Sequence, residues 1–142
     1  MIPSVAECIF KFLNCITETD EIMKIHIVDK PWGREVVWAK NHFYAGKILE
    51  VRKGQRLSLQ YHEKKKETMY LLEGSAILEI RDMADKAFRS VNLELDQSID
   101  IESKTIHRLI AMEDSKILEV STPELADVVR LEDDYGRQTS EC

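Results

Sequence analysis

From residue 24 onward the chain consists of short stretches in which apolar residues alternate with polar ones, or in which β-branched and aromatic residues predominate. Alternation with a period of two places the apolar side chains on one face of an extended strand. Roughly ten such strands are expected, about 8–12 residues apart, which is typical of an all-β sandwich or barrel. A polar loop or a single helical turn is expected at 83–88. Examples of the expected strands are residues 36–38, 43–44, 48–51, 76–80, 91–95, 106–112 and 117–120.

The first 23 residues have a different pattern. Apolar residues recur there at the spacing of one helix face, at Val5, Ile9, Phe12, Leu13 and Ile16. Ser4 and Glu7 have the spacing of a capping box, which favours a helix start. The sequence therefore predicts a short helical extension over residues 1–23, followed by one domain over residues 24–142. The extension is expected to pack on the barrel or at a dimer interface, or to be a frayed segment upstream of the domain.

The segment 54–74 contains the residues with the most specific chemistry. Gln60 and His62 are two positions apart on an expected strand, so their side chains project from the same face. A polar turn at 63–66 follows, and Glu67 opens the next apolar stretch. If the two strands pair as a hairpin, Glu67 comes back beside Gln60 and His62.

These three side chains are candidate metal ligands. An imidazole, a carboxylate and a carboxamide oxygen are metal donors, and His107 is the candidate for the fourth position. A single histidine on a strand is more often packed or solvated, so the hypothesis depends on the whole set. The donors suit zinc best, and manganese, iron, cobalt and nickel remain open.

Composition excludes several classes of protein. With 26 acidic against 20 basic residues, the chain lacks the basic face that non-specific nucleic-acid binding needs. No apolar stretch approaches the ~20 residues that span a bilayer. Cys8, Cys15 and Cys142 form neither a metal motif nor a disulfide framework. A reduced, cytoplasmic setting is expected.

Several motifs occur in a specific order along the chain. They are Lys30-Pro31-Trp32-Gly33, the segment from Gly54 to His62, Glu67, Glu73-Gly74, His107-Arg108-Leu109, and the segment from Val129 to Arg137. Together they resemble the cupin domain of type II phosphomannose isomerases, which is also the C-terminal part of mannose-1-phosphate guanylyltransferase/isomerases. The similarity covers about residues 28–137. It implies a jelly-roll β-barrel that holds one divalent metal ion, forms a homodimer and acts on a sugar phosphate.

The chain departs from that family at two places. The residues between the motif His and Glu are typically His-His-Arg-Ala, whereas here they are Glu63-Lys64-Lys65-Lys66. Lys65 thus stands where an arginine is expected to contact substrate, and lysine keeps the charge but loses the bidentate fork. Before His107, Glu102-Ser103-Lys104 replaces Pro-x-Gly. The metal ligands are therefore intact while the residues around the substrate are altered.

Aldose–ketose isomerisation needs a Lewis acid, a base and cations for the phosphate. Arginine suits phosphate because it keeps its charge and forks onto two oxygens. We assign catalytic roles to Lys65, Arg130 and Glu132, with Asp134 as an alternative base. The assigned substrate-binding residues are Arg56, Arg108, Arg137 and Tyr135. For each cation the alternative is a solvated surface charge, and the three carboxylates at 132–134 could form an exposed turn.

The favoured function is interconversion of mannose 6-phosphate and fructose 6-phosphate through an enediol. Alternatives are a non-catalytic cupin that binds metal and sugar, and a cupin enzyme for another sugar phosphate or a sugar nucleotide. A metal-dependent oxygenase is less favoured, since the amide of Gln60 is a weak donor for redox iron.

Overall fold

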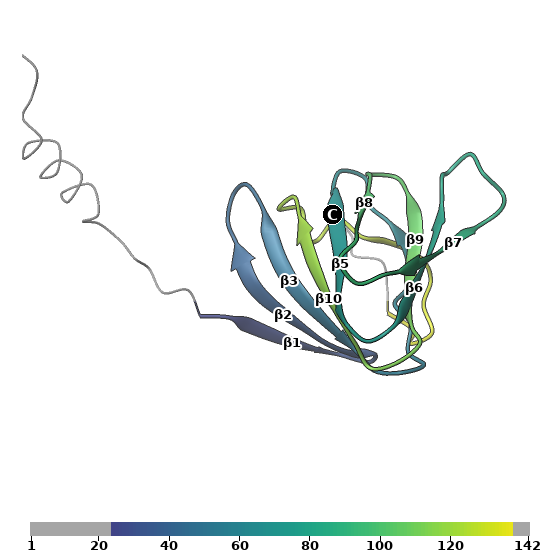
Figure 1. Ribbon diagram of the computed structural model, residues 1–142. Coiled ribbons are helices and arrows are strands. Elements are labelled where there is room, and N and C mark those ends of the chain that lie inside the picture. The colour runs from purple at the N-terminus through teal and green to yellow at the C-terminus, as the bar shows by residue number, and fades with distance from the viewer. Residues whose placement is uncertain (1–23, 138–142) are drawn as a thin grey trace, which may run out of the picture.

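The structure, a computed structural model, describes residues 24–137, which form two antiparallel sheets (Figure 1). The larger sheet has the order β1 (His26–Lys30), β2 (Gly33–Lys40), β3 (Ala45–Val51), β10 (Ser115–Ser121), β5 (Glu67–Glu73) and β8 (Ser98–Ile101). The smaller sheet has the order β11 (Val129–Glu132), β4 (Leu59–Tyr61), β9 (Ile106–Ala111), β6 (Ala76–Arg81) and β7 (Arg89–Leu93). The predicted helix at 1–23 lies outside the described residues.

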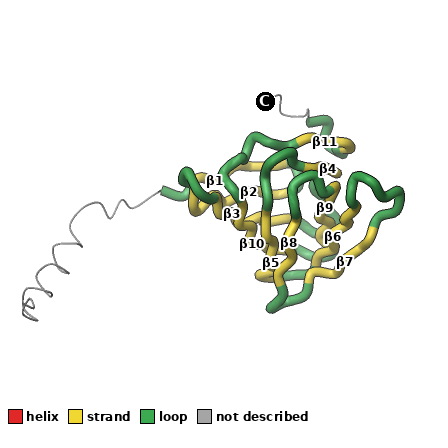
Figure 2. Tube along the Cα trace, turned by 90° about the horizontal axis from the view of Figure 1, so that it is seen from above, coloured by secondary structure: helices red, strands yellow, loops and turns green. Residues whose placement is uncertain are grey.

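The two sheets face each other and curve around a common interior, as the view from above shows (Figure 2). This is the all-β double-sheet architecture that the alternation predicts. The loop expected at 83–88 is confirmed between β6 and β7. Within residues 24–137 there is no helix long and apolar enough to cross a membrane.

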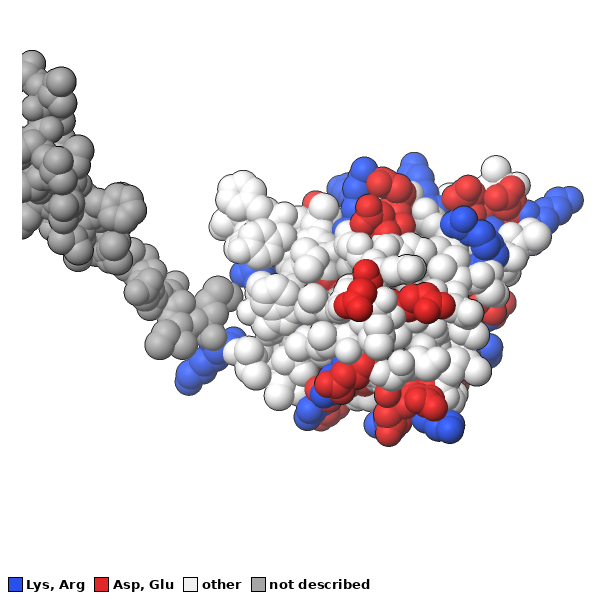
Figure 3. Space-filling model, in the orientation of Figure 1, with Lys and Arg blue, Asp and Glu red and all other residues white. Residues whose placement is uncertain are grey.

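The outer face of the larger sheet is apolar along one row of paired positions. The strand register places Ile27 opposite Val36, Val36 opposite Ile48, Ile48 opposite Leu118, and Leu118 opposite Tyr70. Figure 3 shows a mostly uncharged area on this side of the molecule, with acidic side chains near the middle of the face and the other charged side chains mainly along its upper and lower margins. We call these five residues the outer apolar row.

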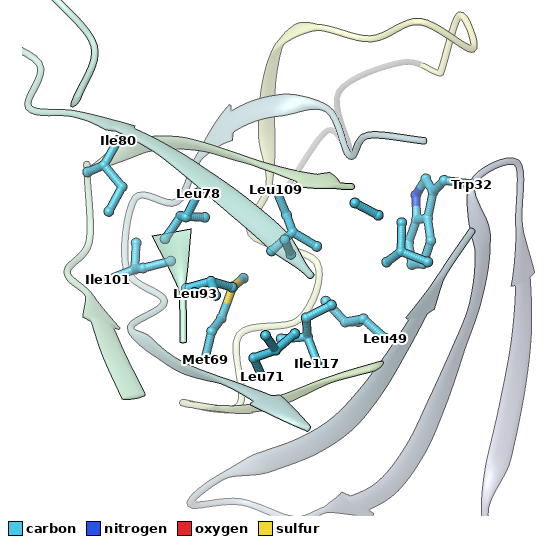
Figure 4. Close-up of a cluster of buried hydrophobic side chains, with 13 residues drawn as sticks. Trp32, Leu49, Met69, Leu71, Leu78, Ile80, Leu93, Ile101, Leu109 and Ile117 are labelled. Carbon is cyan, nitrogen blue, oxygen red and sulfur yellow. The ribbon is translucent and has the colours of Figure 1, made fainter. Parts of the chain in front are cut away.

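The core lies between the sheets and takes the alternate, inward-facing residue of each strand. Leu49, Met69 and Ile117 from the larger sheet meet Leu78 and Leu109 from the smaller one (Figure 4). Burial of each such side chain stabilises the fold by about 1.5–3 kcal/mol. Trp32, in the turn between β1 and β2, is also buried in this core.

Two expectations about local structure are wrong. Residues 43–44 do not form a strand but a turn, because the side-chain oxygen of Asn41 accepts the backbone N–H groups of Phe43 and Tyr44 at 2.8 and 3.1 Å. Asparagine commonly replaces strand pairing with such local bonds.

The second wrong expectation is the hairpin between residues 57–61 and 68–72. Strands β4 and β5 do not pair: β4 pairs with β11 and β9, whereas β5 pairs with β10 and β8. The connection at 62–66 crosses from one sheet to the other. The Asp127 carboxylate fixes this crossing by accepting the backbone N–H groups of Glu63, Lys64 and Lys65.

Candidate metal centre

Three predicted ligands meet in the interior between the two sheets. His62 directly follows β4, His107 lies on β9, and Glu67 is the first residue of β5. Their side chains are buried, with residue exposures of 4%, 2% and 3%, respectively. Their possible ligand atoms all lie within 4.8 Å of one another.

The sheet register explains why these residues converge. Gln60 on β4 is directly opposite His107 on β9, so both side chains project from the same face of the smaller sheet. His62, two residues after Gln60, joins them on that face. Glu67 comes from the larger sheet, whose inner face is opposite. The convergence expected of a hairpin is thus produced by packing of two sheets.

Both histidines are oriented by backbone carbonyl groups. The Nδ1–H of His62 donates to the carbonyl of Asp127, and the Nδ1–H of His107 donates to the carbonyl of Thr105 at 2.9 Å. A carbonyl can only accept, so each Nδ1 carries a proton, and in the neutral imidazole Nε2 is the nitrogen that has the lone pair. Such bonds to the second ring nitrogen typically fix metal-binding histidines.

The electrostatics of the cluster fit a cation. His107 Nε2 lies 2.9 Å from Glu67 Oε1, and His62 Nε2 lies 3.9 Å from Glu67 Oε2. Both Nε2 atoms and Glu67 Oε1 are buried without a partner in hydrogen-bond geometry among the described residues. Acceptors this close are favourable only with a proton or a metal ion between them. The donor set therefore fits a divalent metal ion.

Burial and neighbouring charges set the protonation of the ligands. Burial, and next the positive charge of Lys65, lower the pKa of His62 to about 4, so this imidazole is neutral near pH 7. Burial alone would raise the pKa of Glu67, but the Lys65 and His107 charges and contacts hold it well below its ordinary value. A neutral imidazole and a carboxylate are the forms that bind metal.

Gln60, the remaining predicted ligand, lines the same cavity. Its side-chain oxygen accepts a hydrogen bond from the Ser58 hydroxyl at 2.7 Å. A carbonyl oxygen has a second lone pair, so this bond leaves it able to bind a metal ion. Its role as a ligand stays a prediction.

A network of buried charges extends from Glu67 into the larger sheet. The Lys65 ammonium contacts the Glu67 carboxylate and lies 2.9 Å from Glu119 Oε1. The Nζ of Lys47 lies 3.8 Å from the same Glu119 oxygen and 3.7 Å from Glu35 Oε2. Burial opposes the charge of Lys65, but Glu119 and Glu67 raise its pKa above the ordinary value. Lys65 is therefore an ammonium and not a base.

The cavity beside the metal centre has a volume of about 200 Å³. Its lining has more positive than negative side chains: Lys30, Lys47, Lys65, Arg108, Arg130 and Arg137 against Glu35, Glu67 and Glu119. Burial, and next the charge of Arg137, lower the pKa of Arg130. Cations that disfavour each other's charge in this way favour binding of an anion.

The remaining predicted site residues are distributed differently. Arg108 and Arg137 line the cavity and also form ion pairs, with Glu79 and Asp133 respectively. Three others are not part of the cavity lining: Glu132 pairs with Arg108, Arg56 pairs with Asp134, and the Tyr135 hydroxyl donates to Gln55 Oε1 at 2.8 Å. The structure thus brings together Gln60, His62, Lys65, Glu67, His107, Arg108, Arg130 and Arg137.

Sequence reasoning missed Glu119, Lys47 and Glu35. The sequence contained a signal for two of them. On β3, Lys47 shares a face with the buried Leu49 and Val51, and on β10, Glu119 shares a face with the buried Ile117, so both charged side chains face inward. A charged residue at an inward-facing position is unusual and indicates a polar site in the interior.

This double-sheet fold, with a His–Glu–His cluster on its inner faces, places the protein in the cupin class. The family model for the C-terminal domain of mannose-6-phosphate isomerase matches residues 17–133. The chain belongs to that family.

Solved structures support the fold. KdgF from Halomonas sp. has 16% identity and a TM-score of 0.57, with 75% of this chain and 93% of that chain covered. The capsular polysaccharide assembling protein CapF from Staphylococcus aureus has 16% identity and a TM-score of 0.66, with 93% and 43% covered. Oxalate decarboxylase from Bacillus subtilis has 16% identity and a TM-score of 0.67, with 92% and 39% covered. This chain thus spans less than half of the latter two proteins. A search of curated proteins found no significant match.

Proposed function

We propose that this protein is a metal-dependent isomerase of a sugar phosphate, with mannose 6-phosphate and fructose 6-phosphate as the favoured pair. The observation that carries the proposal is the buried cluster of His62, Glu67 and His107 at a cavity with excess positive charge. Membership in the family of mannose-6-phosphate isomerase C-terminal domains supports it. The cavity volume of about 200 Å³ is on the scale of a single sugar rather than a polymer.

In this proposal His62, Glu67 and His107, with Gln60 as the fourth ligand, hold one divalent metal ion, for which zinc is favoured. The metal ion would supply Lewis acidity, polarising the carbonyl and hydroxyl oxygens of the sugar. The Asp127 and Thr105 carbonyls keep the Nε2 lone pairs of the two histidines directed at the site.

The other residues of the cavity bind and stabilise charge. The Lys65 ammonium is held beside Glu67, where it stabilises negative charge that develops on a sugar oxygen. Arg130 and Arg137 bind the phosphate, and Arg108 supports them from the smaller sheet. The backbone of β11, which carries Arg130, pairs with β4, so the phosphate subsite is built next to the metal ligands.

The test is a coupled assay for fructose 6-phosphate formation from a panel of hexose phosphates. It compares metal-loaded protein with chelator-stripped protein and with stripped protein after metal is restored. We expect activity with mannose 6-phosphate that disappears on stripping and returns with zinc. Tight metal binding without turnover of any hexose phosphate would contradict the isomerase.

A second candidate is a non-catalytic cupin that binds metal and a sugar ligand. The observation in its favour is that Lys65, which replaces the family's arginine, is already engaged by the two carboxylates of Glu67 and Glu119. Calorimetry with the same hexose phosphates distinguishes it, because binding without isomerisation is then expected.

A further inference from the structure

Glu119 is a buried carboxylate in the cavity wall, outside the cluster of possible metal ligands. It lies on β10, with 4% of its surface exposed, and it lines the cavity together with the metal cluster. It is not a member of the group of possible ligands formed by His62, Glu67 and His107. Its strand position is directly opposite Lys47 and Met69.

The contacts of Glu119 leave one of its oxygens available. The ammonium groups of Lys65 and Lys47 both approach Oε1, at 2.9 and 3.8 Å. Among the described residues, the hydrogen bond to the Glu119 carboxylate goes to Oε1, from the Lys65 ammonium. Oε2 is not one of the fully buried polar atoms that lack a hydrogen-bond partner. Oε2 therefore keeps some accessible surface, and because Glu119 lines the cavity, we take Oε2 as the oxygen that can act on a bound molecule.

Stability alone does not explain this arrangement. An apolar residue would suit the inward-facing position of Glu119, as Ile117 does two residues earlier. Buried ion pairs contribute little net stability, because desolvation offsets their attraction, and apolar replacements are often as stable. Buried charges kept beside a cavity and a metal centre are instead typical of a functional site.

We propose that Glu119 is the general base that moves the proton between C1 and C2 of the sugar, an inference that rests on the isomerase proposed above. Of the carboxylates in the cavity lining, Glu67 belongs to the metal cluster. Glu35 is one ion pair farther from the metal cluster than Glu119, because Lys47 connects it to Glu119. Glu119 is linked to Glu67 through Lys65 alone, so among the lining carboxylates outside the metal cluster it has the shortest chain of contacts to that cluster.

The proton transfers balance without an added reagent. Glu119 Oε2 takes the proton from C2, the C2–H electrons form the C1=C2 bond, and O1 becomes negative beside the Lys65 ammonium. The proton on O2 passes to O1 within the substrate. The C2=O2 bond then forms while the electrons of the C1=C2 bond take the proton from Glu119 to C1. The ketose is complete and Glu119 is again a carboxylate.

The experiment measures exchange of the C2 proton of mannose 6-phosphate with D2O by NMR, together with kcat, metal content and the Kd of a hydroxamate analogue of the enediolate. The variants are Glu119→Gln and Glu119→Asp, with Glu50→Gln as the matched control, because Glu50 is an ion-paired glutamate of the larger sheet that does not line the cavity. General base catalysis contributes about 10²–10⁴-fold, so Glu119→Gln should lose about 10³-fold in both C2 exchange and kcat. Its metal content and its Kd for the analogue should change less than about threefold. The reason is that the Glu119 side chain is proposed to bind neither the metal ion nor the analogue. Glu50→Gln should keep most activity.

Glu119→Asp keeps the charge and covers the case in which the Gln variant does not fold. It should remain folded and metal-bound, with C2 exchange reduced at least about tenfold by the retracted carboxylate. C2 exchange at more than a tenth of the wild-type rate in a folded Gln variant would overturn the role of Glu119 and leave the isomerase intact. An absence of exchange in the metal-loaded wild type would overturn the isomerase itself, and the role of Glu119 with it.

Discussion

The imidazole of His62 illustrates how much of this site depends on the surroundings of single residues. The ring is neutral because it is buried beside the ammonium of Lys65, and its Nδ1–H is bound by the Asp127 carbonyl. His107 differs. Burial alone would lower its pKa, but the adjacent Glu67 carboxylate raises the pKa above its ordinary value. The two ligands should therefore respond to pH in different ranges.

The lowered pKa of His62 predicts a loss of stability in acid. The unfolded chain binds a proton on His62 near pH 6.5, whereas the folded, metal-free protein does so only near pH 4. Stability is therefore lost as the pH falls from about 6.5 to 4, by roughly 3 kcal/mol in total. Urea unfolding of the metal-free protein and of His62→Gln across this range measures the effect. Parallel pH curves for the two proteins would contradict it.

At the scale of elements, the strands were predictable because alternation records which face of each strand is buried. β6, with its buried Ala76, Leu78 and Ile80, is an example. The pairing of strands was not predictable, because alternation does not specify a partner. The crossing at 62–66 depends on Asp127, which lies over 60 residues away in sequence. Likewise, the candidate ligands His62, Glu67 and His107 were proposed from their chemistry, whereas Glu119 was recognised only once β10 was placed against the cavity.

Asp127 should link the crossing segment to the metal centre. Its carboxylate accepts three backbone N–H groups from residues 63–65, and its carbonyl orients His62. Asp127→Ala should lower the free energy of unfolding by about 1.5–3 kcal/mol and weaken metal binding about 10–100-fold. Asp127→Asn, which keeps one acceptor oxygen, should lose less of both. Chemical denaturation and metal competition measure the two effects; unchanged metal affinity in the Ala variant would contradict the link.

At the scale of the whole molecule, the two sheets have different surroundings. Their inner faces hold the core and the charged site, whereas the outer face of the larger sheet carries the outer apolar row across five strands (Figure 3). Exposed apolar area of this continuity is typical of a protein interface. A second copy of the chain is the expected occupant, because one continuous, uncharged row can pair with itself about a two-fold axis.

The homodimer is therefore predicted to form through the outer apolar row. Light scattering should give twice the chain mass of 16.5 kDa for the wild type. Ile27→Glu, at a residue 48% exposed, should shift the mass toward the monomer without unfolding the protein. Leu131→Glu, at a residue 46% exposed on the smaller sheet, is the matched control and should remain a dimer. A monomeric wild type, or a dimer unaffected by Ile27→Glu, would contradict this.

The central claim, that His62, Glu67 and His107 bind one divalent metal ion, is tested most directly by elemental analysis of the purified protein and of two histidine variants. We expect one metal ion per chain in the wild type and in His42→Ala, whose side chain is exposed in the turn before β3. His107→Ala should lose at least about 100-fold in affinity and contain almost no metal, because it removes a ligand outright. Equal metal content in His107→Ala and His42→Ala would show that the cluster is not a metal site.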